Sequence, residues 1–321
     1  MTQPAPPAGG GARSVRVPDE RAGQRLDNFL LGQLKGAPRS LVYKLVRSGQ
    51  VRVNGGRAKA ERKLEAGDEV RIPPVRLELP QDGGRSPPKG LLAALESAIV
   101  FEDARLLAIN KPSGIASHGG SGISFGVIET LRALRPRDSL ELVHRLDRDT
   151  SGLMVLAKKR SALTELQRLL REDHGSGIEK RYLALLVGRM PDGTMSVDAP
   201  LHVGLRQGGE RHVQVNPAGK PSISHFRVLE RRGGQSYCEV RIETGRTHQI
   251  RVHAQHIGHP VAGDDKYGDA DANRRLREQA GLKRLFLHAS TLEFALEGGQ
   301  APYSLNAPLV PELIEVLDRL R

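Results

Sequence analysis

The chain is poor in residues that several classes of protein need. Of its 321 residues one is cysteine, and tryptophan is absent. A single cysteine excludes an internal disulfide and a zinc site built on cysteines. Aromatic residues make up only 3% of the chain, which argues against an RNA-binding sheet that stacks bases on aromatic side chains.

Long apolar segments are also missing. The longest aliphatic runs have five residues each, at 91–95, 153–157 and 183–187, whereas a membrane-spanning helix needs about 20. The N-terminus has no basic start followed by an apolar stretch, so no signal peptide is visible. Together with the single cysteine, these absences lead us to expect a cytoplasmic protein with no membrane partner.

Positive charge is present in excess. The chain has 49 Lys and Arg against 37 Asp and Glu, a net charge of +12, which points to a polyanionic partner such as nucleic acid or an acidic membrane surface. Residues 21–76 alone hold 13 Lys and Arg against five Asp and Glu, a net charge of +8. A solvated basic face is the alternative, but a whole module biased in this way more often meets phosphates.

Two stretches have little to bury. Residues 1–13 are mostly Pro, Gly and Ala, which predicts a disordered tail. Residues 77–96 contain several prolines and glycines and show no clear apolar period until Leu91, which predicts a linker. Between and after them we expect a small module at 14–76 and a larger unit at 97–321.

The module at 14–76 combines predicted helices with predicted strands. Helical spacing predicts a helix at 25–30, and Ser40 is expected to be the N-cap of a second helix. Short strands are expected at 51–53 and 68–72. This small α/β module resembles the S-four-type (αL) RNA-binding domain. The motifs that carry the resemblance are Arg25-Leu26-Asp27, Ser40, the run from Gly49 to Gly55, and Gly67-Asp68.

The larger unit alternates short β-branched runs with a few helices. Strands are expected at 99–102, 106–110, 152–157, 182–187, 222–229, 237–244 and 286–294, and helices near 124–134, 161–171 and 311–321. Strands outnumber helices, and the two do not alternate regularly. The pattern therefore predicts an α+β fold with a mixed, largely antiparallel sheet.

The densest group of charged residues lies at 143–152, directly before an apolar strand. It contains the two carboxylates Asp147 and Asp149 and the arginines Arg145 and Arg148. Burying an ionised carboxylate costs several kcal/mol unless it is paired. The segment is therefore either a solvated turn or a built site, and its composition does not separate a carboxylate nucleophile from a general base.

A second polar series follows the strand expected at 237–244. Arg246, His248, Gln249 and Arg251 come directly after Gly245, which can turn the chain. Guanidinium groups recognise phosphates and pair with carboxylates, so this series is either a binding site or a solvated strand edge.

Metal and nucleotide sites receive little support. His248, His253, His256 and His259 have a spacing suggestive of metal binding, but no cysteine or carboxylate completes the set before Asp264. The glycine-rich run at 119–122 lacks the spacing of a P-loop and its following Lys-Ser/Thr pair. We expect no metal and no nucleotide cofactor.

Six motifs follow one another over about 99–292: Val100–Asp103, Asn110–Gly114, His144–Gly152, Lys180-Arg181-Tyr182, Gly245–His253 and His259–Asp264. In order and spacing, they resemble those of the RluA-type family of pseudouridine synthases. The resemblance implies isomerisation of specific uridines in large-subunit (23S) ribosomal RNA to pseudouridine, without a cofactor. We also expect the protein to be a monomer.

The resemblance also implies roles for individual residues. Asp147 would be the catalytic carboxylate, since it follows Arg145-Leu146 directly, and Asp149 would be a turn or support residue. Arg251 would pair with Asp147 and hold it ionised and oriented. Tyr182 would lie against the uracil and take part in proton transfer.

Four further residues are implied to bind the substrate. Arg145 would occupy the space that a flipped base vacates. Arg246, His248 and Gln249 would also take part in substrate binding.

Two other functions compete with an RNA-modifying isomerase. One is a non-catalytic RNA-binding protein that uses the basic module alone, but such a protein needs none of the motifs around Asp147. The other is a metal-dependent RNA hydrolase, which the missing carboxylate cluster disfavours.

Overall fold

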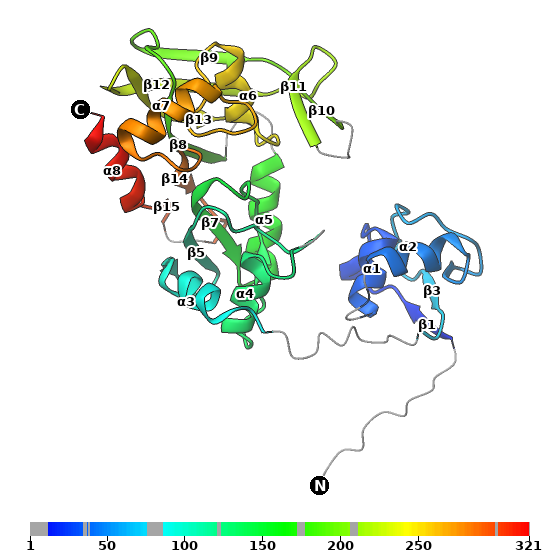
Figure 1. Ribbon diagram of the computed structural model, residues 1–321. Coiled ribbons are helices and arrows are strands. Elements are labelled where there is room, and N and C mark those ends of the chain that lie inside the picture. The colour runs from blue at the N-terminus through cyan, green and yellow to red at the C-terminus, as the bar shows by residue number, and fades with distance from the viewer. Residues whose placement is uncertain are drawn as a thin grey trace. The chain divides into compact units, whose positions relative to one another are not determined.

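In this computed structural model, the residues described are 12–34, 37, 39–75, 86–120, 123–171, 177–205, 211–298 and 301–320. The chain divides into two compact units, Met1–Arg85 and Ser86–Arg321 (Figure 1). The hydrophobic core of the first unit is separate from those of the second. No helix among the described residues is long and apolar enough to cross a membrane.

The N-terminal unit packs two helices against a small antiparallel sheet. Helices α1 (Leu26–Gln33) and α2 (Arg39–Arg47) accompany a three-stranded sheet in the order β1 (Arg13–Arg16), β3 (Glu69–Ile72), β2 (Arg52–Val53), and a 3-10 turn, η1, covers Asp19–Arg21. Asn54 and Gly55 both have positive φ, of 51° and 77°, as a tight Asn-Gly turn requires.

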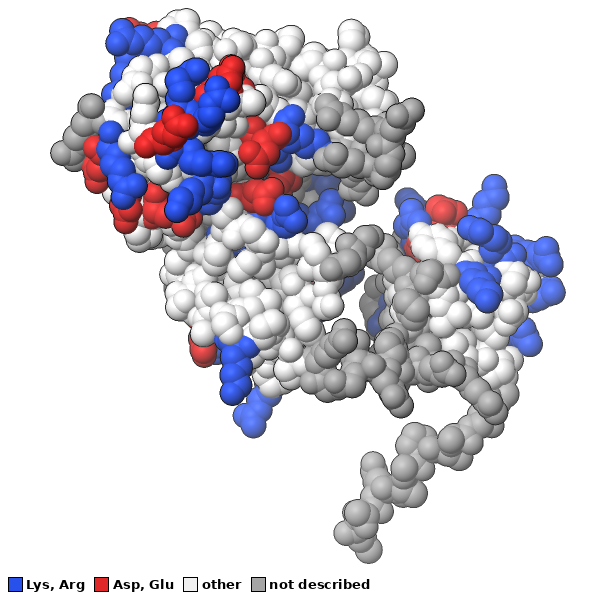
Figure 2. Space-filling view, in the orientation of Figure 1, with Lys and Arg blue, Asp and Glu red and all other residues white. Residues whose placement is uncertain are grey.

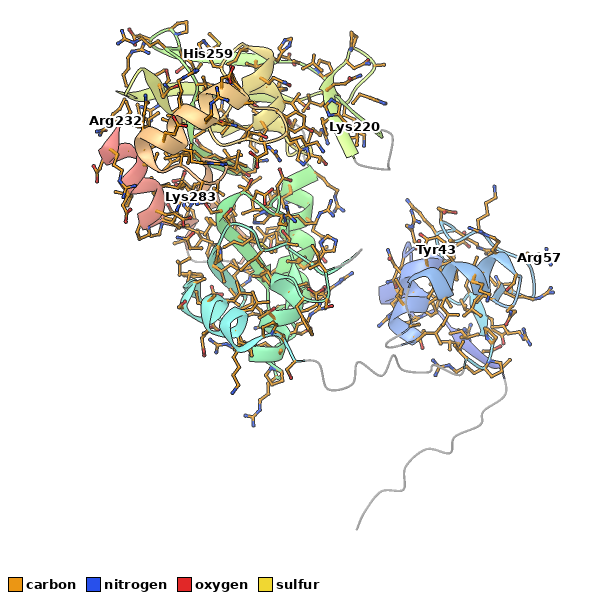
Figure 3. The ribbon with its side chains drawn as sticks, in the orientation of Figure 1. Tyr43, Arg57, Lys220, Arg232, His259 and Lys283 are labelled. Carbon is orange, nitrogen blue, oxygen red and sulfur yellow. The ribbon has the colours of Figure 1, made fainter. Side chains whose placement is uncertain are left out.

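A buried carboxylate ties the two helices of this unit together. Asp27 on α1 accepts hydrogen bonds from the Arg25 guanidinium at 2.7 Å and from the Tyr43 hydroxyl on α2 at 2.9 Å; Tyr43 is labelled in Figure 3. The side-chain hydrogen bond from Arg25 is the main reason why the pKa of Asp27 is lowered. The Arg-Leu-Asp motif of the sequence thus holds α1 against α2.

The C-terminal unit is built on one ten-stranded sheet. Its strand order is β4-β5-β7-β14-β8-β13-β12-β9, with β6 paired to β7 and β15 paired to β14. The β7–β14 pair is parallel and the other pairs of this sheet are antiparallel. The predicted α+β fold with a mixed, largely antiparallel sheet is confirmed. The strands are β4 (Ile99–Glu102), β5 (Leu106–Lys111), β6 (Glu141–Leu142), β7 (Ser151–Ala157), β8 (Ile178–Leu186), β9 (Thr194–Asp198), β12 (Ile223–Arg232), β13 (Gln235–Ile242), β14 (Leu287–Phe294) and β15 (Tyr303–Asn306).

Helices cover this sheet and divide its apolar side chains into several cores. The helices are α3 (Lys89–Ser97), α4 (Val127–Leu134), α5 (Arg160–Arg171), α6 (Gln249–His256), α7 (Ala270–Ala280) and α8 (Pro311–Arg319). One core joins β5 and β7 to α4 and α5, and another joins β8, β12 and β13 to α6. Tyr182 on β8 packs against both of these cores, which puts it near the centre of the sheet. A separate hairpin, β10 (Leu201–Leu205) and β11 (Arg211–Val215), forms a two-stranded sheet of its own.

Close approach of two central strands requires a glycine. Gly152 lies in β7 opposite Ala289 of β14, with φ of +108°. A Cβ atom at this position would collide with the backbone of Ala289. The glycine that ends the charged segment at 143–152 is therefore needed where the segment enters the sheet.

Several sequence-based boundaries were wrong. Helix α3 occupies Lys89–Ser97 and buries Leu95, so the end of the expected linker at 77–96 belongs to the folded unit; Pro88 precedes this helix as its N-cap. Strand β1 begins at Arg13, inside the expected tail. Helix α2 begins at Arg39, so Ser40 lies within it and not at its N-cap. Residues 1–11 and 76–85 lie outside the described residues.

Candidate active site

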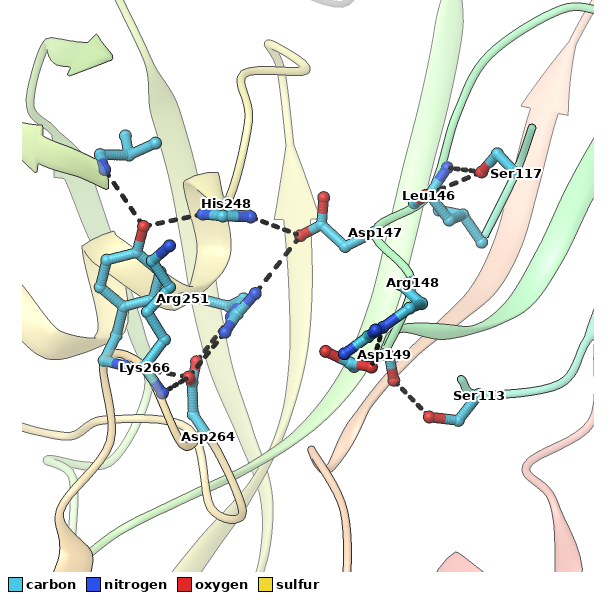
Figure 4. A network of polar contacts seen from close by, with 12 residues as sticks. Ser113, Ser117, Leu146, Asp147, Arg148, Asp149, His248, Arg251, Asp264 and Lys266 are labelled. Carbon is cyan, nitrogen blue, oxygen red and sulfur yellow. Dashed lines mark hydrogen bonds and ion pairs between the residues drawn. The ribbon is translucent and has the colours of Figure 1, made fainter. Parts of the chain in front are cut away.

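Asp147 lies on the loop between β6 and β7, and its neighbours on both sides are anchored. The Ser117 hydroxyl donates to the carbonyl of Leu146 at 2.8 Å and accepts from the Leu146 backbone N–H at 3.1 Å (Figure 4). On the other side, the carbonyl of Arg148 accepts hydrogen bonds from the ammonium group of Lys111 at 3.0 Å and from the Gly114 N–H at 2.8 Å. The carboxylate is thus presented from a fixed backbone.

Lys111 is a fully buried lysine that binds this loop, and burial lowers its pKa to about 7. Its ammonium group also donates to the carbonyls of Pro112 at 2.9 Å and Ile115 at 2.8 Å. Three carbonyls thereby take the place of water around the charge, which a buried ammonium requires. Lys111 therefore joins two loops, 112–115 and the one that carries Asp147.

Arg251 stands between two carboxylates. Its Nε and one terminal nitrogen bind Asp264 in a bidentate pair of 2.6 and 2.7 Å, while its other terminal nitrogen lies 3.8 Å from Asp147 Oδ2 (Figure 4). The expected pairing of Arg251 with Asp147 is present, but its distance is longer than the distances between Arg251 and Asp264. Asp264 fixes the guanidinium, and the terminal nitrogen that does not bind Asp264 faces Asp147.

His248 approaches the same oxygen of Asp147. Its Nε2 lies 3.8 Å from Asp147 Oδ2, and its Nδ1 lies 2.7 Å from the Tyr267 hydroxyl. His248 has φ of 54° at the N-cap of α6. A non-glycine residue in the left-handed region costs free energy and persists where the surroundings enforce it, often at functional sites.

A small pocket brings all seven predicted site residues together. Its volume is about 90 Å³, and it adjoins a larger cavity of about 750 Å³. Asp147, Tyr182 and His248 line both. The volume of the larger cavity is within the size range of small-molecule sites. Basic side chains that line the larger cavity are Arg145, Arg148, Lys180, Arg181, Arg246 and Lys266. The seven predicted residues that line the small pocket are Asp147, Tyr182, Arg251, Arg145, Arg246, His248 and Gln249.

The structure distinguishes the two candidate carboxylates. Asp147 lines both cavities, whereas Asp149 lines neither. Asp149 is 46% exposed and pairs with Arg148 at 3.2 Å, and its backbone carbonyl accepts from the Ser113 hydroxyl. This is the arrangement of a turn residue.

Gln249 is fully used by the fold. Its amide oxygen accepts from the Thr244 hydroxyl and the Arg246 N–H, and its amide nitrogen donates to the carbonyl of Ile223 and the hydroxyl of Ser224. The two bonds from the amide nitrogen use both of its N–H donors. Gln249 therefore shapes the turn between β13 and α6, and it has no donor left for a substrate.

Two residues of the site were not among the predicted ones. Asp264, which binds Arg251, and Tyr267, which contacts His248, both follow α6. Asp264 closes the motif His259–Asp264, so its position in that motif was the available signal; Tyr267 lies just beyond it. Within the described residues, no three His, Cys, Asp or Glu side chains are grouped so that they could hold a metal ion.

The chain was compared with protein-family models and with known proteins. Residues 105–256 match the family model of RNA pseudouridylate synthases, and residues 24–70 match that of the S4 domain. The chain is 52% identical over 309 residues to ribosomal large subunit pseudouridine synthase C of Escherichia coli strain K12, with 96% of each chain covered. It is 49% identical to the Pasteurella multocida protein of the same name, covering 96% of this chain and 94% of that one.

Solved structures agree with these matches. Human RNA pseudouridylate synthase domain containing 4 superposes with a TM-score of 0.58 at 27% identity, covering 72% of this chain and 95% of that chain. The family expected from the motifs is therefore confirmed, as is the N-terminal S4 domain. Similarity to synthase C was also expected, from the run between His118 and Glu129. The chain belongs to the RNA pseudouridylate synthase family.

Proposed function

We propose that this protein isomerises specific uridines of large-subunit ribosomal RNA to pseudouridine, with Asp147 as the catalytic carboxylate. The observation that carries the proposal is the position of Asp147: its backbone is anchored on both sides, and its carboxylate faces Arg251 and His248 in the pocket that Tyr182 also lines. The relatives named above as large-subunit synthases supply the substrate class.

The chemistry fits the groups that are present. A uridine stacked in RNA must be flipped out before an enzyme can reach its glycosidic bond, and Arg145, an exposed residue at the pocket, is suited to fill the vacated space. Breaking the bond between uracil and ribose separates charge, which Arg251 and the other cations of the cavity stabilise. Three actions remain open to Asp147: attack on the sugar, addition to the base, or removal of a ribose proton.

The position of Tyr182 in the pocket supports a contact with the base. Tyr182 lines the pocket from β8, and burial together with the charge of Asp147 raises its pKa above the usual value of a tyrosine. A neutral phenol at this position keeps its proton in the resting enzyme and presents an apolar ring to uracil. We assign to it both packing against the base and a part in proton transfer.

The reaction needs no co-reactant, because pseudouridine is an isomer of uridine and the glycosidic bond that breaks is replaced by one that forms. We accordingly propose that the enzyme works without a cofactor. Since one chain supplies all seven predicted site residues of the pocket, a monomer suffices. A protein that modifies ribosomal RNA is expected to act in the cytoplasm.

Mapping of pseudouridine in ribosomal RNA tests this function directly. RNA from cells with and without the protein is compared, and the purified protein is then added to unmodified RNA. We expect a small set of large-subunit positions to lose pseudouridine in its absence and to regain it in vitro. An unchanged map, or changes confined to other RNAs, would contradict the assignment.

We further propose that the N-terminal unit binds the RNA backbone. Among the charged residues on its visible face in Figure 2, Lys and Arg outnumber Asp and Glu. Arg52 and Arg71 are directly opposite each other on β2 and β3, and both are exposed. Like charges in this arrangement destabilise a sheet, so a phosphate between them would relieve the repulsion.

Deleting residues 1–76 is expected to weaken RNA binding and its salt dependence more than the chemical step. Each lost phosphate contact lowers the slope of log affinity against log salt by about 0.7–0.9. The pocket residues all lie beyond residue 99, so a saturating short RNA should be converted at a similar single-turnover rate. The measurements are binding at several salt concentrations, single-turnover rate and melting temperature.

A double variant separates RNA binding from a scaffold role. Arg52→Gln with Arg71→Gln should reduce the salt slope without lowering the melting temperature. The matched control, Arg275→Gln with Lys283→Gln, removes two exposed charges of the C-terminal unit that line neither cavity; Lys283 is labelled in Figure 3. An unchanged slope in the first variant, or a collapsed melting temperature in the deletion, would favour a scaffold.

A further inference from the structure

The hydroxyl of Tyr267 lies between a strand and the candidate active site. Its oxygen accepts a hydrogen bond from the backbone N–H of Val213 on β11 at 3.1 Å. On its other side it lies 2.7 Å from Nδ1 of His248. Tyr267 is 1% exposed, so solvent does not compete for these bonds. Within the described residues, these are the two hydrogen bonds of the hydroxyl.

Counting protons decides which way the second bond runs. A backbone N–H can only donate, so the Tyr267 oxygen must accept from Val213. The hydroxyl has one proton of its own, and a buried hydroxyl proton requires an acceptor. Nδ1 of His248 is the neighbour that can accept it. Nδ1 of His248 is then unprotonated, and in neutral imidazole the proton is on Nε2.

The protonated nitrogen is the one that faces Asp147. Nε2 lies 3.8 Å from Asp147 Oδ2. Burial lowers the pKa of His248, although the charge of Asp147 acts in the opposite direction, so the imidazole is neutral at physiological pH. Asp147 therefore faces the N–H of a neutral ring without a second full positive charge beside Arg251.

Tyr267 also contacts the other partner of Asp147. The Arg251 guanidinium carbon lies 5.0 Å from the centre of the Tyr267 ring, within the distance of a cation–π contact. Val213 and Tyr267 belong to one small apolar core with Leu201 and Val252. One side chain thus touches both groups that approach Asp147 and is held in place by the β10–β11 hairpin.

We propose that Tyr267 is a positioning residue of this enzyme: it fixes neutral His248 in the Nε2–H form, aimed at Asp147, and is itself oriented by the Val213 N–H of the hairpin. The inference rests on the proposed function, because it concerns the residue assigned there as the catalytic carboxylate. It adds to that function a residue that orients the side chain of His248 and that lies outside the motif Gly245–His253.

The tautomer of His248 can be measured without any activity. The full chain is labelled with ¹⁵N-histidine, and the signal of His248 among the 11 histidines is identified by its loss in His248→Gln. We expect Nε2–H in the native protein above the titration range of the ring, and a mixture of both tautomers in Tyr267→Phe. An Nδ1–H ring or a doubly protonated ring in the native protein would overturn the proposal.

Kinetics test whether this positioning matters. Tyr267→Phe should lower the single-turnover rate at saturating RNA roughly 10- to 100-fold, the cost of misplacing a reacting group, with little change in KM. Tyr237→Phe is the matched control, since Tyr237 packs against Phe286 and lines neither cavity. His248→Gln, which keeps an N–H near the position of Nε2, should retain more activity than His248→Leu.

The outcomes are separable from those of the proposed function. If Tyr267→Phe has the rate of Tyr237→Phe, or if its rate falls only as far as its melting temperature explains, the positioning role is refuted. If Asp147→Asn stays active, the assignment of Asp147 fails, and the measured tautomer still reports whether Tyr267 fixes His248.

Discussion

Asp147→Asn is expected to abolish pseudouridine formation and to leave RNA binding nearly intact. Asparagine has almost the shape of aspartate, but it cannot act as an anionic nucleophile or as a base. The loss should be roughly four orders of magnitude or more, as for other residues that act on the reacting atoms. Single-turnover conversion of a saturating RNA measures the rate, and binding is measured separately on the same RNA.

Asp149→Asn is the matched control for this variant. The two carboxylates are two residues apart on the same loop, but Asp149 is half-exposed, pairs with Arg148 and lines neither cavity. It should keep most of the activity. If Asp149→Asn were inactive and Asp147→Asn active, the catalytic role would pass to Asp149.

The fold could be predicted from the sequence wherever apolar periodicity was local. Strands such as β5 and β7, and helices such as α5, have apolar residues at regular spacing and were predicted within a few residues. Helix α3 was missed because its leucines follow Pro87 and Pro88. Proline is typical of linkers, but it is also tolerated where a helix begins, since the first turn needs no N–H partner.

The polar segment around Arg251 shows a different limit. Its residues were expected near a turn or strand edge, whereas residues 249–256 form helix α6, whose Ile250 and Ala254 pack into the core. The left-handed backbone of His248 cannot be deduced from a residue type that seldom adopts it. The family resemblance named His248 and Arg251, which lie 3.8 Å from Asp147, but it did not predict the backbone conformation that brings them there.

Long-range partners were the least predictable part of the site. Family resemblance indicated that Arg251 meets Asp147, and the two lie 3.8 Å apart. Arg251 binds Asp264 more closely. This contact depends on the path of the chain after α6, which no local sequence pattern predicts. For the same reason Tyr267 was not predicted as a site residue, although it contacts both His248 and Arg251.

The Arg251–Asp264 pair leads to the second large effect. The Asp264 side chain is 0% exposed and that of Arg251 is 8% exposed. Asp264→Asn would leave the guanidinium buried with its closest counter-charge removed, which costs about 3–5 kcal/mol. For a unit of this size, that corresponds to a fall in melting temperature of roughly 6–20 °C. Activity should fall as well, because Arg251 is then free to collapse onto Asp147 and occupy its oxygens.

The pH dependence of this effect has a definite sign. Burial alone would raise the pKa of Asp264, but the hydrogen bonds and charge of Arg251 outweigh it, and the pKa is lowered. A depressed carboxyl pKa stabilises the fold above the unfolded value of about 3.9 and loses this contribution as the pH falls through the folded value. The difference in stability between the native protein and Asp264→Asn should therefore be at its full size at pH 7. It should disappear only in acid, below about pH 4.

Asp265→Asn provides the control for both measurements. Asp265 is the next residue along the chain and is exposed, so its loss should change the melting temperature by less than about 1–2 °C, as for most surface substitutions. Thermal unfolding of the three proteins between pH 3 and 8 decides the matter. A melting temperature of Asp264→Asn equal to that of Asp265→Asn at pH 7 would show that the buried pair does not hold Arg251. The 3.8 Å approach of Arg251 to Asp147 would then have to be maintained by the packing of α6 alone.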